Sequence, residues 1–108
     1  MVSAGHIPGI SDDICFALQQ IFSRFVHIDT VLLFGSRAKG SYKNGSDIDL
    51  AVCAPALSES AFTDLWNQID ALPIIFKIDL LHWDRLANQA LKEKIITEGQ
   101  VFYRGKRA

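Results

Sequence analysis

A chain of 108 residues that is 49% hydrophobic can build one core, so we expect a single domain over residues 1–108 without stabilising disulfides or structural metals. The 11 basic and 12 acidic residues give a net charge of −1. Because duplex-binding domains usually carry a basic excess, the composition does not favour a domain that binds duplex nucleic acid. No apolar run approaches the ~18 residues of a membrane helix, and residues 1–10 lack a signal-peptide pattern, so the sequence predicts a cytoplasmic protein. Cys15 and Cys53 lie in apolar stretches and are interpreted as reduced thiols.

The first third of the chain predicts a helix and a strand. We interpret residues 1–10 as a loose lead-in. Ser11 is a candidate N-cap followed by two acids, and apolar residues then recur at helical spacing, which predicts a helix over about 11–26. The β-branched and aromatic run 30–34 predicts a buried strand that ends at Gly35.

A polar connection and a second strand follow. Residues 36–46 are small, polar and basic, and are expected to begin with a turn of helix. Residues 47–52 alternate polar and apolar, which predicts a strand whose even-numbered side chains face the core. Because the connection is too short for a crossover helix, we expect the two strands to be antiparallel neighbours.

The second half of the chain predicts alternating helices and strands. Apolar spacing favours a helix over about 58–71, and residues 75–81 predict a third strand. Asp84 is a candidate cap for a last helical stretch, which is expected to end at Gly99. An edge strand is expected at 101–103.

The order of these elements indicates the fold class. We interpret residues 104–108 as a basic, solvated tail. The other elements mix helices with a small sheet, which predicts an α/β (α+β) fold. Its mixed β-sheet would have three to four strands, with helices packed mainly on one face.

Three aspartates are the candidate metal ligands. Asp47 and Asp49 are two residues apart on one strand and project from the same face, as Lys77 and Asp79 do on the third strand. If these strands are neighbours, three carboxylates share one patch, where their repulsion favours a bound Mg²⁺ or Mn²⁺ ion. The alternative is three unrelated surface acids. The pair Asp47 and Asp49 favours the metal site, because Asp is depleted in strands.

A candidate phosphate-binding turn precedes the aspartates. Gly35 lets the backbone approach a ligand closely, Ser36 adds a hydroxyl donor, and helix N-termini bind phosphate. Three cations follow within seven residues: Arg37, Lys39 and Lys43. The alternative is a basic surface turn.

A P-loop is rejected for the same turn. Gly35 and Gly40 have P-loop spacing, but Ser41 and Tyr42 stand where Lys and Ser or Thr are required. The glycine turn, the Asp-x-Asp pair and the later aspartate instead predict a site that holds a nucleoside triphosphate together with its metal ions.

These motifs support a resemblance to a known family. The segments LFGSRAKG (33–40), SDIDLAV (46–52) and KIDLL (77–81) resemble the signature of the minimal nucleotidyltransferase (MNT) proteins of the DNA polymerase β superfamily. The resemblance covers roughly residues 11–103 and implies a palm-like mixed α/β fold. Lys39 stands where many members have Arg, which keeps the charge.

The resemblance also implies roles for individual residues. Asp47 and Asp49 would bind two Mg²⁺ (or Mn²⁺) ions, and Asp79 would share a metal and activate the acceptor hydroxyl. The nucleotide, ATP or another triphosphate, would be bound by residues around the glycine turn and before the carboxylate pair: Gly35, Ser36, Arg37 and Ser46.

The expected function is transfer of a nucleoside monophosphate, AMP from ATP, to a hydroxyl acceptor. The resemblance implies a small helical partner of the HEPN type. The alternative is a non-catalytic antitoxin or nucleotide-binding assembly module. Because so short a chain leaves no second helical domain for an acceptor, we expect that surface in another chain or in a second copy of this one. His6, His27 and His82 have no metal-ligand spacing and are interpreted as surface or packing residues.

Overall fold

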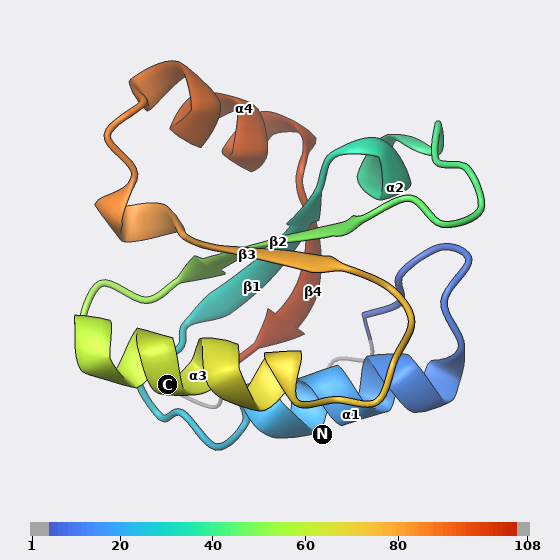
Figure 1. Ribbon diagram of the computed structural model, residues 1–108. Coiled ribbons are helices and arrows are strands. Elements are labelled where there is room, and N and C mark those ends of the chain that lie inside the picture. The colour runs from blue at the N-terminus through green and yellow to red at the C-terminus, as the bar shows by residue number, and fades with distance from the viewer. Residues whose placement is uncertain (1–4, 106–108) are drawn as a thin grey trace.

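The computed structural model describes residues 5–105, and its elements follow the predicted chain order (Figure 1). They are α1 (Asp12–Phe22), β1 (Thr30–Phe34), α2 (Ser36–Lys39), β2 (Ile48–Cys53), α3 (Glu59–Asp70), β3 (Ile78–His82), the 3₁₀ turn η1 (Trp83–Arg85), α4 (Gln89–Glu98) and β4 (Gln100–Arg104). Within residues 5–105, none of the helices combines the length and the hydrophobicity that crossing a membrane requires.

The four strands form one mixed sheet in the order β3-β2-β1-β4. Strand β1 is antiparallel to both β2 and β4, whereas β2 and β3 run parallel. The antiparallel pairing of β1 with β2 confirms the prediction drawn from their short connection. The expected α+β fold with a four-stranded mixed sheet is also confirmed.

Helices cover the two faces of the sheet unequally. Helices α1 and α3 lie together under one face, and α4 lies over the other (Figure 1). The main core lies between the sheet and the helices α1 and α3. It includes the even-numbered side chains of β2, as predicted: Ile48, Leu50 and Val52. A much smaller cluster under α4 contains Leu32, Ala51 and Ile95. The face that carries α4 is therefore the more open one, and it carries the candidate site.

Residues 5–10 pack against the core, so the prediction of a loose lead-in is wrong for this segment. Ile7 and Ile10 are 0% and 3% exposed and belong to the main core. The Gln19 side chain donates a hydrogen bond to the Gly5 carbonyl at 3.0 Å. The glycines and the proline here make a turn that returns the chain to the core, rather than a free end. Residues 1–4 lie outside the described part of the chain.

Two elements are shorter than predicted. Helix α1 ends at Phe22 instead of residue 26, because the Ser23 hydroxyl donates to the Gln20 carbonyl and the chain turns there. Strand β3 begins at Ile78 instead of residue 75, and Ile75 is 94% exposed. In both cases the apolar pattern continues beyond the hydrogen-bonded element.

Asp84 has a different role from the predicted cap. Its carboxylate accepts a hydrogen bond from the Ala54 backbone N–H at 2.6 Å, so it joins η1 to the end of β2. Asn88 caps α4 instead, accepting from the Leu91 N–H at 3.0 Å. Arg104 lies in β4 rather than in a tail, and residues 106–108 lie outside the described part of the chain.

Candidate active site

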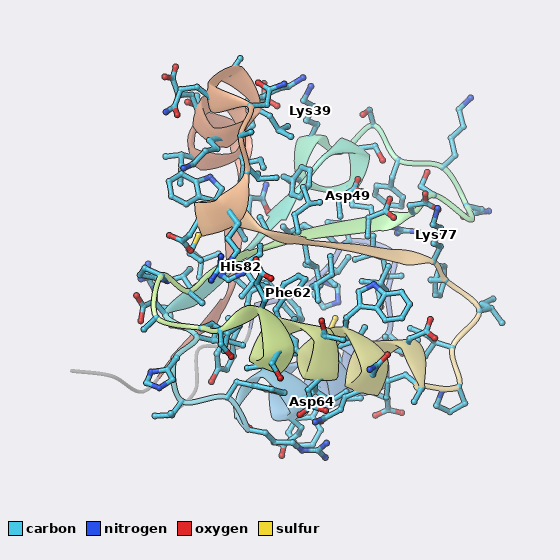
Figure 2. All side chains as sticks on the ribbon, turned by 60° about the vertical axis from the view of Figure 1, so that its left-hand side comes forward. Lys39, Asp49, Phe62, Asp64, Lys77 and His82 are labelled. Carbon is cyan, nitrogen blue, oxygen red and sulfur yellow. The ribbon has the colours of Figure 1, made fainter. Side chains whose placement is uncertain are left out.

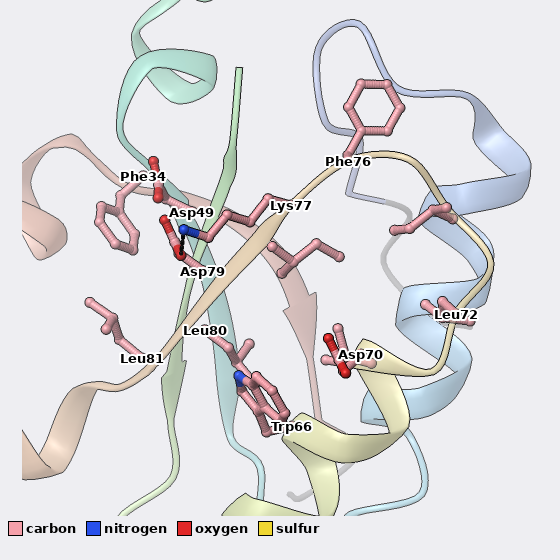
Figure 3. Close-up of a pocket in the computed structure, with 13 residues that line it drawn as sticks. Phe34, Asp49, Trp66, Asp70, Leu72, Phe76, Lys77, Asp79, Leu80 and Leu81 are labelled. Atoms are coloured by element: carbon pink, nitrogen blue, oxygen red, sulfur yellow. Dashed lines mark ion pairs between the residues drawn. The ribbon is translucent and has the colours of Figure 1, made fainter. Parts of the chain in front are cut away.

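The parallel pairing of β2 with β3 places two of the predicted carboxylates side by side. Asp49 is in register with Asp79 on one side and with Phe34 of β1 on the other. Figure 3 shows the two carboxylates next to each other, with Lys77 alongside and its ammonium 3.8 Å from an Asp79 oxygen. Asp47 is exposed just before β2 begins. The structure thus joins Asp49 and Asp79, and leaves Asp47 at the entrance of the strand.

The environment of Asp49 disfavours its negative charge. Burial, followed by the charge of Asp79, a side-chain hydrogen bond with Asp79 and the charge of Asp47, raises the pKa of Asp49 to about 6. Lys77 opposes this shift only in part. Because other carboxylates disfavour the negative charge of Asp49, an additional cation at this place is favourable.

The donor set fits a hard divalent cation, although a complete metal centre is not preformed. Across residues 5–105, no group of three or more His, Cys, Asp or Glu side chains is arranged to hold a metal ion. The adjoining carboxylates of Asp49 and Asp79 nevertheless offer only oxygen, which Mg²⁺ prefers. Asp47 lies near enough for its charge to raise the pKa of Asp49.

Gly35 lies directly against the Asp49 carboxylate. It has φ +77° and immediately precedes α2, and a Cβ at this position would collide with Oδ2 of Asp49. Glycine is therefore required both by the left-handed backbone and by the close approach of the carboxylate. The sequence predicts that a ligand approaches the backbone closely at Gly35, but nothing in the sequence indicates the contact of Gly35 with the Asp49 carboxylate.

We expect Gly35→Ala to impair the site beyond its cost in backbone strain. Gly40→Ala is the matched control, because Gly40 has φ +81° but a Cβ there meets no atom of residues 5–105 within 4 Å. Gly40→Ala should lose about 1–2 kcal/mol of stability from its αL conformation, and Gly35→Ala should lose more, because φ +77° with ψ −156° is a conformation that is open essentially to glycine alone. Only Gly35→Ala should also weaken Mg²⁺-dependent ATP binding, as titration calorimetry would measure. Equal ATP affinity in the two variants would contradict the role of this contact.

Two cavities share Phe34, the residue of β1 that is in register with Asp49. A cavity of about 510 Å³ runs along β3 and α3 and is lined by Asp49, Asp79 and the half-exposed Trp66 (Figure 3). A cavity of about 290 Å³ lies between α2 and α4 and is lined by Gly35 and Ser36. The side chain of Phe34 is common to the walls of both cavities.

The Arg37 side chain lines neither of these two cavities, and its predicted role as a nucleotide ligand stays a prediction. The residue is 2% exposed, and its guanidinium donates to the Ser46 carbonyl at 2.9 Å and to the Pro8 carbonyl at 2.7 Å. It also stacks on the rings of Tyr42 and Phe76. Arg37 therefore fastens α2 to the following loop and to the start of the chain.

Ser46 belongs to the same loop structure. Its hydroxyl accepts a hydrogen bond from the Lys43 N–H at 2.8 Å, and its carbonyl accepts from Arg37. These bonds close the turn that leads into Asp47. The Ser46 hydroxyl accepts in this bond and keeps its own proton for donation, so its predicted role as a nucleotide ligand stays a prediction.

His82 confirms the interpretation of a packing residue. It is 8% exposed, and its ring stacks on the Phe62 ring with the two ring centroids 5.0 Å apart. Its Nε2 lies 2.8 Å from the Ala54 carbonyl oxygen. In Figure 2, His82 and Phe62 lie at the opposite end of the sheet from Asp49 and Lys77. His82 is therefore not a candidate ligand at the carboxylate site.

Comparison with known families identifies the domain. The family model described as "Polymerase beta, Nucleotidyltransferase" matches residues 17–108. The chain belongs to the polymerase beta nucleotidyltransferase family. The resemblance drawn from the glycine turn and the Asp-x-Asp strand is thereby confirmed. No curated protein matches this nucleotidyltransferase domain in sequence.

Solved structures share the fold of this nucleotidyltransferase domain. One is a crystal structure of a toxin–antitoxin with AMP-PNP, with 23% identity, a TM-score of 0.65, and coverage of 90% of this chain and 76% of the other. Another is a mutant of the toxin–antitoxin MntA-HpeT, with 20% identity, a TM-score of 0.62, and coverage of 90% and 75%. At these identities the likeness concerns the fold.

Proposed function

We propose that this nucleotidyltransferase domain transfers AMP from ATP to a hydroxyl group of an acceptor and releases pyrophosphate. The observation that carries the proposal is the pairing of Asp49 with Asp79, directly against the glycine turn at Gly35. Carboxylates adjoining a phosphate-binding turn are what transfer from a metal-bound triphosphate needs. The family of the chain, and the AMP-PNP complex of a protein with the same fold, support the choice of nucleotide.

In this proposal, the aspartates and the glycine turn have different roles in the reaction. Asp47, Asp49 and Asp79 would hold Mg²⁺ or Mn²⁺, which when bound neutralises the triphosphate and makes the acceptor hydroxyl more acidic. Gly35 and Ser36 would bind the phosphates through backbone N–H groups and the serine hydroxyl. Asp79 would accept the proton of the acceptor hydroxyl. The acceptor oxygen then bonds to the α-phosphorus, and the bond from that phosphorus to pyrophosphate breaks.

The acceptor belongs to a partner protein in this proposal. The described helices and strands form one small layered fold, and the cavity along β3 opens beside Asp79. Two proteins that share this fold are described as toxin–antitoxin complexes, which supports a protein partner. We propose a helical HEPN-type partner that supplies the hydroxyl. The domain would act in the cytoplasm.

A second candidate function is a non-catalytic antitoxin that acts by complex formation alone. One observation favours it, namely that residues 5–105 contain no preformed group of three metal-ligating side chains. In that case ATP would not be consumed, and the partner would be neutralised by contact.

An experiment with labelled ATP separates the two functions. The protein is co-purified with the product of its neighbouring gene and incubated with ATP labelled at the α-phosphate and with Mg²⁺. We expect label on the partner and release of pyrophosphate, both lost in the Asp47→Asn, Asp49→Asn double variant. Asp64→Asn is the control, because Asp64 lies on the exposed side of α3 away from Asp49 (Figure 2). Absence of label on any protein would favour the non-catalytic antitoxin.

A further inference from the structure

Helix α4 forms the second wall of the cavity beside Gly35 and Ser36. Its residues Leu91, Lys94, Ile95 and Glu98 all line this cavity. Their spacing of three, four and seven residues places them on one face of the helix. Ile95 is buried, Leu91 and Glu98 are partly buried, and Lys94 is exposed.

Of the three lysines around this wall, two are already engaged. Lys39 of α2 lies 3.4 Å from a carboxylate oxygen of Glu98, and Lys92 lies over the Trp83 ring at 4.3 Å from its centre. Lys94 forms no ion pair within residues 5–105 and lines the same cavity as Ser36. An unpaired cation opposite a serine hydroxyl favours an anionic ligand.

The place of the cavity indicates which part of a ligand it would hold. Its wall at Gly35 touches the Asp49 carboxylate, where the reacting α-phosphorus is proposed to lie. Its volume of about 290 Å³ is at the lower end of ligand pockets, which span roughly 300–1,000 Å³. It therefore suits one part of a nucleotide, and its cationic side chains select the phosphates beyond the first.

We propose that α4 completes the triphosphate site, with Lys94 as a binding residue for the β- and γ-phosphates. Lys39 would leave Glu98 for the same phosphates when the nucleotide binds. This inference rests on the proposed function and adds a binding residue on α4 to its site. These contacts would strengthen the binding of a nucleoside triphosphate and would add nothing to the binding of a monophosphate, which has no β- or γ-phosphate.

The test measures affinity for ligands with different numbers of phosphates. AMP, ATP and inorganic tripolyphosphate are titrated into the protein with Mg²⁺ by calorimetry. We expect Lys94→Ala to weaken ATP and tripolyphosphate binding about tenfold or more and to leave AMP binding unchanged. Lys94→Arg should restore most of the affinity. Arg24→Ala is the control, because Arg24 is exposed, donates to the Gln68 side chain and is not among the residues that line this cavity.

The outcomes also separate this inference from the proposed function. If the unaltered protein binds no ATP, the proposed function itself fails. If it binds ATP and Lys94→Ala binds equally well, only the role of Lys94 is overturned. An equal loss of AMP and ATP affinity would also overturn it, since that result indicates a disturbed structure rather than a lost phosphate contact.

Discussion

Asp49→Asn is expected to abolish nucleotidyl transfer and, in the metal-free protein, to raise stability at neutral pH. The first effect, a loss of at least about a hundredfold, follows from removing a charged metal ligand. The second follows because the pKa of Asp49 is raised to about 6 by burial and by the neighbouring carboxylates. At pH 7 the folded protein therefore contains a carboxylate whose charge is disfavoured.

The direction of the pH dependence follows from this raised pKa. The folded chain holds the Asp49 proton more tightly than the unfolded chain, so protonation of Asp49 stabilises the fold. This stabilisation is full below about pH 4 and is lost as the pH rises through about 6. The amide that replaces this carboxyl group in the variant cannot ionise and avoids the loss. Discounted for solvent screening, the gain at pH 7 is about 1 kcal/mol, or a rise in Tm of roughly 4 °C.

Thermal unfolding in a metal chelator between pH 4 and 8 measures this effect. The two melting temperatures should diverge with rising pH, with the variant the more stable above pH 6. Asp64→Asn, on the exposed side of α3, should follow the unaltered protein throughout. A constant difference in Tm across this range would contradict the claim that burial and the neighbouring carboxylates disfavour the charge of Asp49.

Arg37→Ala is expected to have the largest effect on stability, a loss of about 3 kcal/mol. The substitution removes three hydrogen bonds from a guanidinium that is 2% exposed, and it leaves the Ser46 and Pro8 carbonyls without this donor. It also empties the space between two aromatic rings. Tm should fall by at least about 12 °C. Arg37→Lys should restore little, because an ammonium cannot reproduce the planar fork.

The control for this prediction is Arg24→Ala, because the Arg24 side chain is exposed and donates to the Gln68 side chain at the surface. Its Tm should change by less than about 4 °C. If Arg37→Ala instead melts like the unaltered protein and loses ATP binding, Arg37 is a nucleotide ligand, as the sequence first indicated, and the role that we assign to it is wrong.

The parts of the fold that depend on local signals could be predicted from the sequence. Ser11 and Ser58 accept hydrogen bonds from the N–H groups three residues ahead, and the helices begin after them as expected. Strand β1 has the predicted bounds. The burial of Ile7 could not be predicted, because it depends on a core assembled from residues distant in the chain. The same holds for the bond from Asp84 to Ala54.

The candidate site divides in the same way. The alternation around Asp49 indicated its face, and the family signature indicated Asp79, but only the parallel register of β2 and β3 brings them together. The contact of Gly35 with Asp49 depends on the antiparallel pairing of β1 and β2. Lys94 lies on a helix with no signature, so its place beside Ser36 becomes visible only in the folded chain.

Asp47, Asp49 and Asp79 are proposed to form a metal-dependent nucleotide site. Equilibrium binding of ATP, measured with and without Mg²⁺ or Mn²⁺, tests it most directly. The unaltered protein should bind ATP only when the metal is present, and the Asp47→Asn, Asp49→Asn double variant should not bind it under either condition. Metal-dependent ATP binding of unchanged affinity in a folded double variant would show that the site lies elsewhere.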